Sequence, residues 1–525
     1  MSFLGEQLSA TEPVAPLPPV QAEALAIELE RVAGMAIYAR SIVTQNRTIY
    51  FLGKRGSARY LCIVGVGNPL PGFTGETSSI EIDGVSASLQ VCPASAANAH
   101  ALREHLPFLK PQPVGLRKSI GCGDRLGVAT PGHVRAVRRG TMYPAFAQQS
   151  IREMARTGRT PQEVLDDAMW GVFQEGWREG YGADADHLKT TEDIERCIEA
   201  GFVLYTFDPG DYVDDRADEE DVGALRAKVE ELPWDEIETS WADVRRRYLD
   251  RVLDVGNFAI TFDEGTLLRA AAKYGRAVIH TVQLYQHLAG QSGGTNQPYE
   301  VEVSVDETAT PTSPAEHFFV ANELKRLGVQ IVSLAPRFVG RFEKGVDYIG
   351  DVAAFEEQLR VHVAIARALG PYKISFHSGS DKFALYSAAA RVAGDLVHLK
   401  TAGTSYLEAL RTVARVQPAL FREILAFALE RYERDRLSYH VSADVHKIST
   451  VVQHLNDREL QNVLDSFDGR QVLHVTFGSV LTAKQATHEG EYRFRGRLLE
   501  ALQDHENLYY EALEQHFARH ILPFG

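Results

Sequence analysis

The chain has 525 residues, of which 45% are hydrophobic and 24% charged, and its formal net charge is −15. This length is too great for one small core and predicts a barrel with an added domain, or two to three domains. The acidic balance argues against nucleic acid as a partner, because phosphate binding needs a basic face. No apolar stretch is long enough to cross a bilayer, so we expect no membrane partner either.

The four cysteines are scattered and form no C-x-x-C pair. This spacing favours a reducing compartment and disfavours a thiolate zinc site. The first residues lack a basic stretch followed by an apolar run, so we expect no secretory signal. Together these features predict a cytoplasmic protein.

In chain order, residues 1–20 are rich in Pro, Ala and Glu and are expected to be a flexible N-terminus. Residues 21–106 contain helical and β-rich runs and predict a small α+β domain. The expected helices lie at 21–33 and near 96–105, and the β-rich runs at 36–44, 48–53, 59–66 and 78–91. Residues 107–116 are expected to form a stiff linker, because three prolines fall within 107–113.

From residue 117 to 525, short apolar runs alternate with helical stretches, which is typical of right-handed βαβ units and a parallel sheet. This pattern predicts an α/β fold, a (β/α)8 TIM-like barrel with insertions, and the alternative is an open doubly wound sheet. One insertion is expected at about 209–299, with a helix over 266–288. The expected strands lie at 119–122, around His187, and at 202–207, 301–305, 330–334, 372–376, 396–399, 437–441 and 471–477.

Two of these strands stop abruptly in polar residues, within 372–382 and 396–404. In parallel-strand enzymes the active site lies at the carboxyl ends of the strands. Strand alternation places Glu302, Ser304 and Asp306 on one face, which is costly in a barrel unless they meet a metal, a substrate or each other. The same alternation places Ser375 with His377.

Alternation also pairs His187 with Lys189, and His398 with Lys400. A single strand histidine is most often a core residue, but several at strand ends, together with carboxylates, favour a metal site. The chain has no H-E-x-x-H, so it is not a common zinc hydrolase. The expected metal ligands are His187, His377 and Asp306.

Cations follow several of the predicted strands. The glycines of Gly121-Cys-Gly-Asp-Arg-Leu-Gly127 allow a sharp turn that would direct Asp124 and Arg125 into the mouth of the barrel. A cationic cluster within an acidic protein suits a carboxylate- or phosphate-bearing substrate. The expected substrate-binding residues are Arg125, Lys189, Arg337, Ser378, Lys382, His398 and Lys400.

At these residues the chain resembles the tagaturonate/fructuronate epimerase family of bacterial hexuronate catabolism. The resemblance covers most of the chain beyond about residue 115 and rests on several long motifs in order. The motifs are Gly123-Asp-Arg-Leu-Gly-Val-Ala-Thr-Pro-Gly-His133, Asp186-His-Leu-Lys189, Val303-Ser-Val-Asp-Glu-Thr308, Ser333-Leu-Ala-Pro-Arg-Phe-Val-Gly340, Phe376-His-Ser-Gly-Ser-Asp-Lys-Phe383 and His398-Leu-Lys-Thr-Ala-Gly-Thr-Ser405.

The resemblance implies a barrel enzyme, dependent on a divalent metal, that interconverts D-tagaturonate and D-fructuronate. Zn, Mn, Ni, Co and Fe all stay open as its metal. The two sugars differ at a carbinol β to the ketone, so abstraction of an α-proton cannot invert that centre. Retro-aldol cleavage and re-addition on the other face can do so, with Asp124 and Glu302 as the expected acid/base pair and Arg337 or a lysine holding the substrate carboxylate.

Two other enzyme classes fit the same residues. One is another metal-dependent sugar-acid isomerase or aldolase, and the other is a barrel glycoside hydrolase that uses two carboxylates and no metal. A non-enzymatic sugar-binding protein would not need so many inward ionisable groups. The expected partner is a small uronate substrate, and a homo-oligomer is compatible with the sequence.

Overall fold

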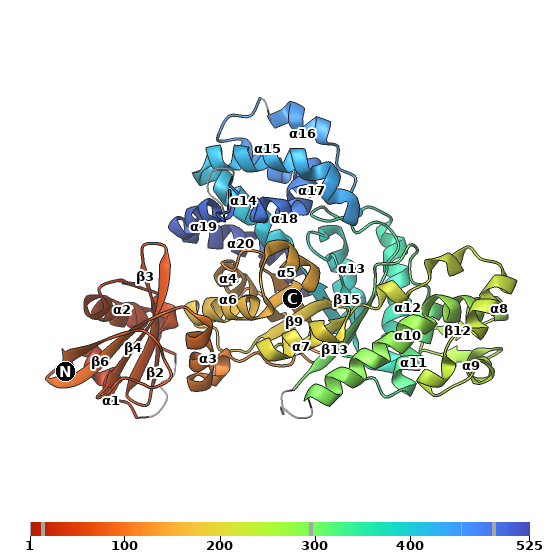
Figure 1. Ribbon diagram of the computed structural model, residues 1–525, viewed down its shortest axis with the longest axis horizontal. Coiled ribbons are helices and arrows are strands. Elements are labelled where there is room, and N and C mark those ends of the chain that lie inside the picture. Colours follow the sequence, from red (N-terminus) through yellow and green to blue (C-terminus); the bar gives the residue numbers. More distant parts are fainter. Residues whose placement is uncertain (1, 12–15, 293–297, 453, 486–489) are drawn as a thin grey trace.

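The computed structural model describes residues 2–11, 16–292, 298–452, 454–485 and 490–525. An antiparallel sheet from the N-terminal part lies at one end of the molecule, a barrel occupies the middle, and a helical insertion lies at the other end (Figure 1). The C-terminal helices α15 (Pro418–Asp435), α16 (Val445–Val452), α17 (Phe467–Val475) and α18 (Phe477–Thr482) form a layer above the barrel in this view.

The N-terminal sheet has six strands in the order β1-β3-β4-β6-β5, with β2 paired to β3. Helix α2 packs on it, and Leu25 and Leu29 from α2 share a buried cluster with Phe51. The run predicted at 78–91 is two strands joined by a turn at Asp83, which has a φ of 50°. The elements are α1 (Phe3–Ser9), α2 (Pro19–Ala33), β1 (Ala36–Ile37), β2 (Val43–Gln45), β3 (Thr48–Arg55), β4 (Ala58–Val66), β5 (Glu76–Ile82) and β6 (Val85–Pro93).

The prediction of a flexible N-terminus is wrong for residues 3–9. These residues form α1, and its Leu4 and Leu8 are buried. Helix α3 (Ala96–His105) follows the sheet as expected. In the proline-rich segment after α3, Glu300 accepts hydrogen bonds from the backbone N–H groups of Val114 and Gly115 at 2.7 and 2.6 Å. This segment is therefore fixed to the first residue of a barrel strand.

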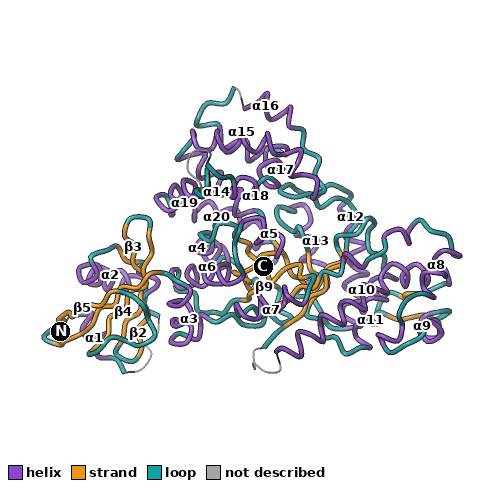
Figure 2. The backbone as a smooth tube through the Cα atoms, in the orientation of Figure 1, coloured by secondary structure: helices purple, strands orange, loops and turns teal. Residues whose placement is uncertain are grey.

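The central sheet is a closed parallel barrel in the order β10-β13-β14-β15-β16-β7-β8-β9. The predicted (β/α)8 fold is confirmed, and closure of the sheet excludes the open doubly wound alternative. The strands lie together at the centre of the molecule with helices around them (Figure 2). They are β7 (Ser119–Gly123), β8 (Tyr143–Ser150), β9 (Gly182–Leu188), β10 (Leu204–Phe207), β13 (Glu300–Val305), β14 (Ser333–Pro336), β15 (Lys373–Phe376) and β16 (Val397–Lys400).

The structure adds one strand that the sequence analysis missed and corrects two strand assignments. Strand β8 was not expected, because its sequence YPAFAQQS is not a continuous apolar run although all eight residues are buried. Residues 437–441 are a 3-10 turn (Arg436–Ser438) followed by loop, and residues 471–477 lie mostly in the buried helix α17. A short apolar run in a buried helix cannot be told from a strand by its periodicity.

Helices cover the outside of the barrel between consecutive strands. Several begin with a capping box, as in α6, where Thr160 and Glu163 exchange hydrogen bonds with each other's backbone N–H. This pairing fixes where each helix starts after its strand. The barrel helices are α4 (Thr130–Val137), α5 (Ile151–Thr157), α6 (Pro161–Gln174), α7 (Thr191–Ala200), α11 (Pro314–Arg326), α12 (Val352–Leu369), α13 (Phe383–Ala393) and α14 (Thr404–Val416).

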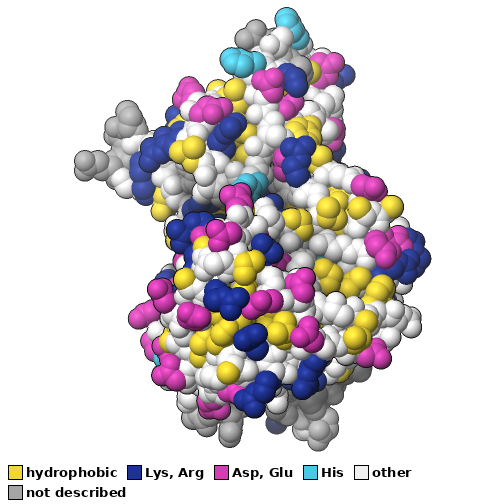
Figure 3. Space-filling model, turned by 90° about the vertical axis from the view of Figure 1, so that its right-hand side faces the viewer, with side chains coloured by type: hydrophobic (Ala, Val, Ile, Leu, Met, Phe, Trp, Pro, Cys, Tyr) yellow, Lys and Arg dark blue, Asp and Glu magenta, His cyan; other side chains and the backbone are white. Residues whose placement is uncertain are grey.

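The insertion after β10 ends in a long helix, α10, whose N-terminus is capped by Asp263 through the N–H of Thr266 at 2.7 Å. The predicted helix is therefore confirmed, and Asp263 is its N-terminal cap. On the face that carries the insertion, basic and acidic side chains are intermixed (Figure 3). The elements are α8 (Val222–Glu230), α9 (Trp241–Tyr248), β11 (Val252–Asp254), β12 (Ala259–Thr261) and α10 (Glu264–Ser292).

The chain after α14 adds helices that belong to no βα unit of the barrel. The loop after α15 reaches the mouth of the barrel through Tyr439. Among the helices in the described ranges, none combines the length and apolar character needed to cross a membrane. The added helices are α15 (Pro418–Asp435), α16 (Val445–Val452), α17 (Phe467–Val475), α18 (Phe477–Thr482), α19 (Arg495–Asp504) and α20 (Glu506–Ile521).

Candidate active site

Buried ionisable side chains gather at the carboxyl ends of β9, β13, β15 and β16. Glu302 on β13 is fully buried, and its Oε1 lies 2.6 Å from Nε2 of His377, just after β15. The same oxygen lies 2.8 Å from Nζ of Lys400 on β16. The predicted inward faces of these three strands are therefore correct, and they meet at one point.

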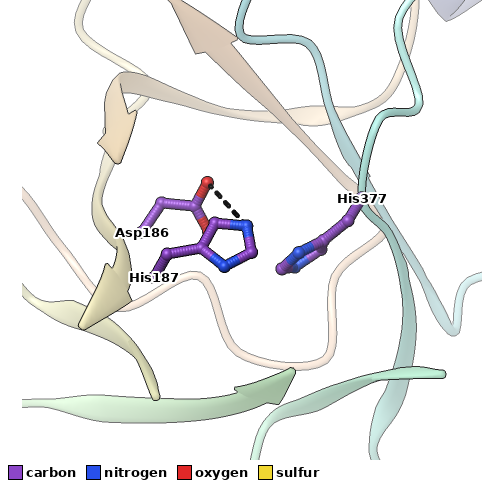
Figure 4. A group of neighbouring side chains, drawn as sticks. All are labelled: Asp186, His187 and His377. Carbon is purple, nitrogen blue, oxygen red and sulfur yellow. Dashed lines mark ion pairs between the residues drawn. The ribbon is translucent and has the colours of Figure 1, made fainter. Parts of the chain in front are cut away.

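Asp186, His187 and His377 can hold a metal ion. Each offers one ligand atom, and these atoms all lie within 4.8 Å of one another. The two imidazole rings lie edge to face across the mouth, with centroids 4.8 Å apart and ring planes at 74° (Figure 4). Two imidazole nitrogens and a carboxylate oxygen suit Zn, Mn, Ni, Co or Fe.

Neighbouring carboxylates orient both histidines. Asp208 lies 2.9 Å from Nδ1 of His187, which leaves Nε2 of that ring facing the mouth and Asp186. Asp306 lies 3.2 Å from Nδ1 of His377. Such carboxylate–histidine pairs fix the ring and its tautomer in metal sites. The structure thus places Asp306 behind His377, and Asp186 takes the ligand position that the sequence assigned to Asp306.

The carboxylates also determine the charge of His377. Burial opposes the charged ring, but Asp306 and Glu302 outweigh burial and raise the pKa of His377 to about 10. Burial likewise opposes the charge on Asp306, yet His377 lowers the pKa of this carboxyl far below its usual range. In the metal-free arrangement the ring is therefore a cation held between two carboxylates.

Strained backbone positions the ligands on β9 and β15. His187 has a φ of 55° and Ser378 a φ of 51°, backbone angles that residues other than glycine rarely adopt. The pairing of β9 with β10 shifts register at this point, from Tyr205 opposite Ala185 to Phe207 opposite Leu188. The irregularity brings both Asp186 and His187 to the mouth, which simple strand alternation would forbid.

Lys400 lies among three buried carboxylates. Its Nζ is 3.0 Å from Asp184, 2.7 Å from Asp186 and 2.8 Å from Glu302. Burial disfavours the ammonium ion, but these carboxylates outweigh burial and raise the pKa of Lys400. Lys400 therefore neutralises Asp184, Asp186 and Glu302, which form the floor of the site below the cavities. Its charge has little capacity left for a substrate anion.

Two adjoining cavities open above this floor. The inner cavity has a volume of about 40 Å³ and the outer one about 340 Å³. The inner cavity is lined by Asp186, His187 and Lys400. Residues that line both cavities are Arg152, His377, Ser378, Lys344 and Tyr439.

Of the predicted acid/base pair, only Glu302 lies among the metal-ligand candidates, directly below the cavities, neither of which it lines. Asp124 uses both carboxylate oxygens to accept hydrogen bonds from the backbone N–H groups of Leu126, Gly127 and Ala129, at 2.6–2.9 Å. The turn after β7 directs only Arg125 to the inner cavity, where it pairs with Glu153 at 2.5 Å. Asp124 is a turn-forming residue, and its assignment as a catalytic acid is corrected.

Three of the predicted substrate-binding residues do not reach the cavities. Lys189 pairs with the exposed Asp211 at 2.8 Å, because the irregularity in β9 turns it away from the mouth. Lys382 donates three hydrogen bonds to backbone carbonyls and thereby ties two loops together. His398 is buried inside the barrel between Ser119 and Asp184, below the ligands. Arg337 and Ser378 do line the outer cavity.

Sequence reasoning missed Asp186, Asp208, Asp184 and Lys344. The sequence did carry a signal for Asp186 and Asp184, since these two residues alternate along β9 with the spacing of an inward face. Asp208 directly follows β10, as a ligand-orienting residue would. Lys344 lies in a long loop after β14, and nothing in its local sequence marks it.

The fold and the site define a barrel enzyme whose chemistry takes place at the carboxyl ends of the strands. A family model described as tagaturonate epimerase matches residues 38–523. The chain is 43% identical over 490 residues to a tagaturonate/fructuronate epimerase from Thermotoga maritima, covering 93% of this chain and 96% of that protein.

Solved structures agree with this match. A glycerol complex and a native crystal structure of the fructuronate-tagaturonate epimerase from Cohnella laeviribosi are each 40% identical to the chain. Each covers 96% of this chain and 99% of that protein with a TM-score of 0.87. The chain belongs to the tagaturonate epimerase family, and it is an isomerase.

Proposed function

We propose that this enzyme interconverts D-tagaturonate and D-fructuronate and that it needs a divalent metal ion held by Asp186, His187 and His377. The observation that carries the proposal is this ligand group, whose ligand atoms all lie within 4.8 Å of one another. To bind the ion, His377 would release its proton and its contact with Glu302 at Nε2, while Asp306 stays at Nδ1. Membership of the family supports the substrate pair. The donor set supports the metal.

The residues suit a retro-aldol route. One carboxylate takes the proton from the hydroxyl β to the ketone, and the bond between that carbinol carbon and its neighbour next to the ketone breaks. The carbinol carbon becomes an aldehyde, and the electron pair of the broken bond passes to the ketone-bearing fragment. When bound, a divalent cation would stabilise the negative charge that develops on the oxygens of that fragment.

Epimerisation requires the aldehyde to turn before the bond forms again on its other face. The alkoxide that forms on re-addition is then protonated by a second acid. The proton taken by the first carboxylate passes back to that acid before the next cycle, so atoms and charge balance. Glu302 and Asp306 approach His377 from opposite ring nitrogens, at 2.6 and 3.2 Å. We assign proton removal and return to this pair, and Asp306 takes the place first given to Asp124.

The substrate carboxylate needs a cation that is not already neutralised, because an unpaired buried charge is strongly disfavoured. Arg337 lines the outer cavity, and no described residue forms an ion pair with its guanidinium. It is suited to hold the end of the sugar that is farther from the metal ligands.

The test is product analysis with and without metal. Purified protein is treated with a chelator, dialysed, and assayed with D-tagaturonate before and after addition of each divalent cation in turn. We expect D-fructuronate as the product, with activity lost on chelation and restored by at least one cation. Full activity in the chelated protein would refute the metal, and free three-carbon products without the epimer would indicate an aldolase.

A further inference from the structure

Six cationic side chains line the two cavities, and most of them already have a carboxylate partner. Such a cation can attract a substrate anion only weakly, because its partner cancels much of its field. The pairs are Arg125 with Glu153 at 2.5 Å, Arg152 with Glu307 at 3.0 Å, Arg341 with Glu343 at 3.3 Å, and Lys400 with its three acids.

Lys344 and Arg337 are the exceptions. Within the described ranges, neither has a carboxylate oxygen within ion-pair distance. The ammonium of Lys344 donates a hydrogen bond to Oγ of Ser378 at 2.6 Å, which satisfies one of its three donors. Ser378 directly follows the metal-ligand candidate His377 in the chain.

The location of Lys344 differs from that of Arg337. Lys344 lines both the inner and the outer cavity, whereas Arg337 lines only the outer one. Burial lowers the pKa of Lys344 and Arg152 lowers it further, while Glu307, Asp306 and Glu153 partly oppose this lowering without coming within ion-pair distance. An ammonium group in this position is costly on its own and would be stabilised by an anion that enters the cavity.

We propose that Lys344 is the residue that selects a sugar carrying a carboxylate, by pairing with that carboxylate where the inner and outer cavities meet. This inference rests on the proposed function, since it names the group that recognises the acid end of the uronate. Arg337 then holds the same carboxylate from the outer side, and Ser378 orients the lysine.

The experiment compares Lys344→Met with Lys344→Arg in the metal-loaded enzyme. A charge-assisted contact in a desolvated site corresponds to about ten- to a hundredfold in affinity. We expect Lys344→Met to raise KM for D-tagaturonate by about this factor. The inhibition constant of the matching neutral ketohexose, D-tagatose, should stay within about threefold. Lys344→Arg keeps the charge and should restore much of the preference for the uronate.

Lys189→Met is the matched control, since Lys189 follows a barrel strand but pairs with an exposed aspartate away from the cavities. Its constants for both sugars should equal those of the wild type. An equal loss of affinity for the uronate and the ketohexose in Lys344→Met would overturn the inference. A fall in kcat with unchanged KM would also overturn it, because it would make Lys344 a proton donor.

Failure of the proposed function gives a different result. In that case the wild-type enzyme would not epimerise D-tagaturonate at all, with any cation. If the wild type is active and the variants show no selective change, the proposed function stands and the role of Lys344 is refuted. Circular dichroism and metal content, measured for each variant, identify any variant that has not folded.

Discussion

Replacing Lys400 by Met should destabilise the protein strongly. The change removes an ammonium group and leaves the carboxylates of Asp184, Asp186 and Glu302 around an apolar side chain. In the wild type these carboxylates lie 2.7–3.0 Å from Nζ of Lys400. Removing one partner of a buried ion pair costs about 3–5 kcal/mol, so we expect a loss in free energy of unfolding of at least about this size.

The assay is urea unfolding at pH 7 in the presence of a chelator, followed by the fluorescence of the buried Trp170 and Trp177. The chelator is needed because a bound cation would itself neutralise some of these carboxylates. Lys189→Met is again the control, because its ion pair is exposed and such pairs contribute about 0–1 kcal/mol. If Lys400→Met and Lys189→Met had the same free energy of unfolding, Lys400 would not be the charge that neutralises the buried carboxylates.

Three further predictions concern Asp186, Glu302 and the buried His133 of α4. Asp186→Ala should lower the metal affinity at least about tenfold, as measured by metal content after dialysis against a fixed free concentration. Glu302→Gln keeps the shape of the side chain but removes the proton acceptor, so turnover should fall roughly 10²–10⁴-fold. The metal content should be retained. Loss of metal in this variant would instead show that Glu302 is a ligand. Burial lowers the pKa of His133 to about 4. The unfolded chain therefore takes up this proton first. His133 alone should lower the free energy of unfolding by about 3 kcal/mol as the pH drops from 6.5 to 4, a contribution that His133→Gln should remove in urea titrations.

The parts of the site that the sequence predicts are those on regular strands. Alternation of side chains brings Glu302, His377 and Lys400 to the inside of the barrel, as expected. Alternation could not predict Asp186 and His187 together, because adjacent residues of a regular strand point to opposite faces. Only the left-handed φ of His187 lets both side chains reach the mouth, and no residue type in the motif predicts that backbone angle.

Residue type alone also misassigns the lysines. Lys189, Lys382 and Lys400 each follow or end a strand, yet they bind an exposed aspartate, three carbonyl groups and three buried acids respectively. Whether a cation can bind substrate depends on what already neutralises it, and those partners come from elements distant in sequence. Lys344 shows the converse, since a residue in an unremarkable loop keeps its charge unpaired.

The C-terminal helices contribute to the site although they are not part of the barrel. Asp381, in the loop that carries His377 and Ser378, has a φ of 61° and needs external support to keep that conformation. Its carboxylate pairs with Arg470 of α17 at 2.8 Å and with His516 of α20 at 2.5 Å.

Asp381, His516 and His520 could by composition also hold a metal ion. However, Nε2 of His520 already accepts a hydrogen bond from the backbone N–H of Asp381 at 3.0 Å. The carboxylate of Asp381 is in turn neutralised by Arg470. These contacts make the cluster a support for the loop, and the strained loop in turn sets where His377 and Ser378 stand. The helices after β16 therefore add to the contacts that Thr404 and Lys382 make with this loop, and they help to fix the geometry of the ligands.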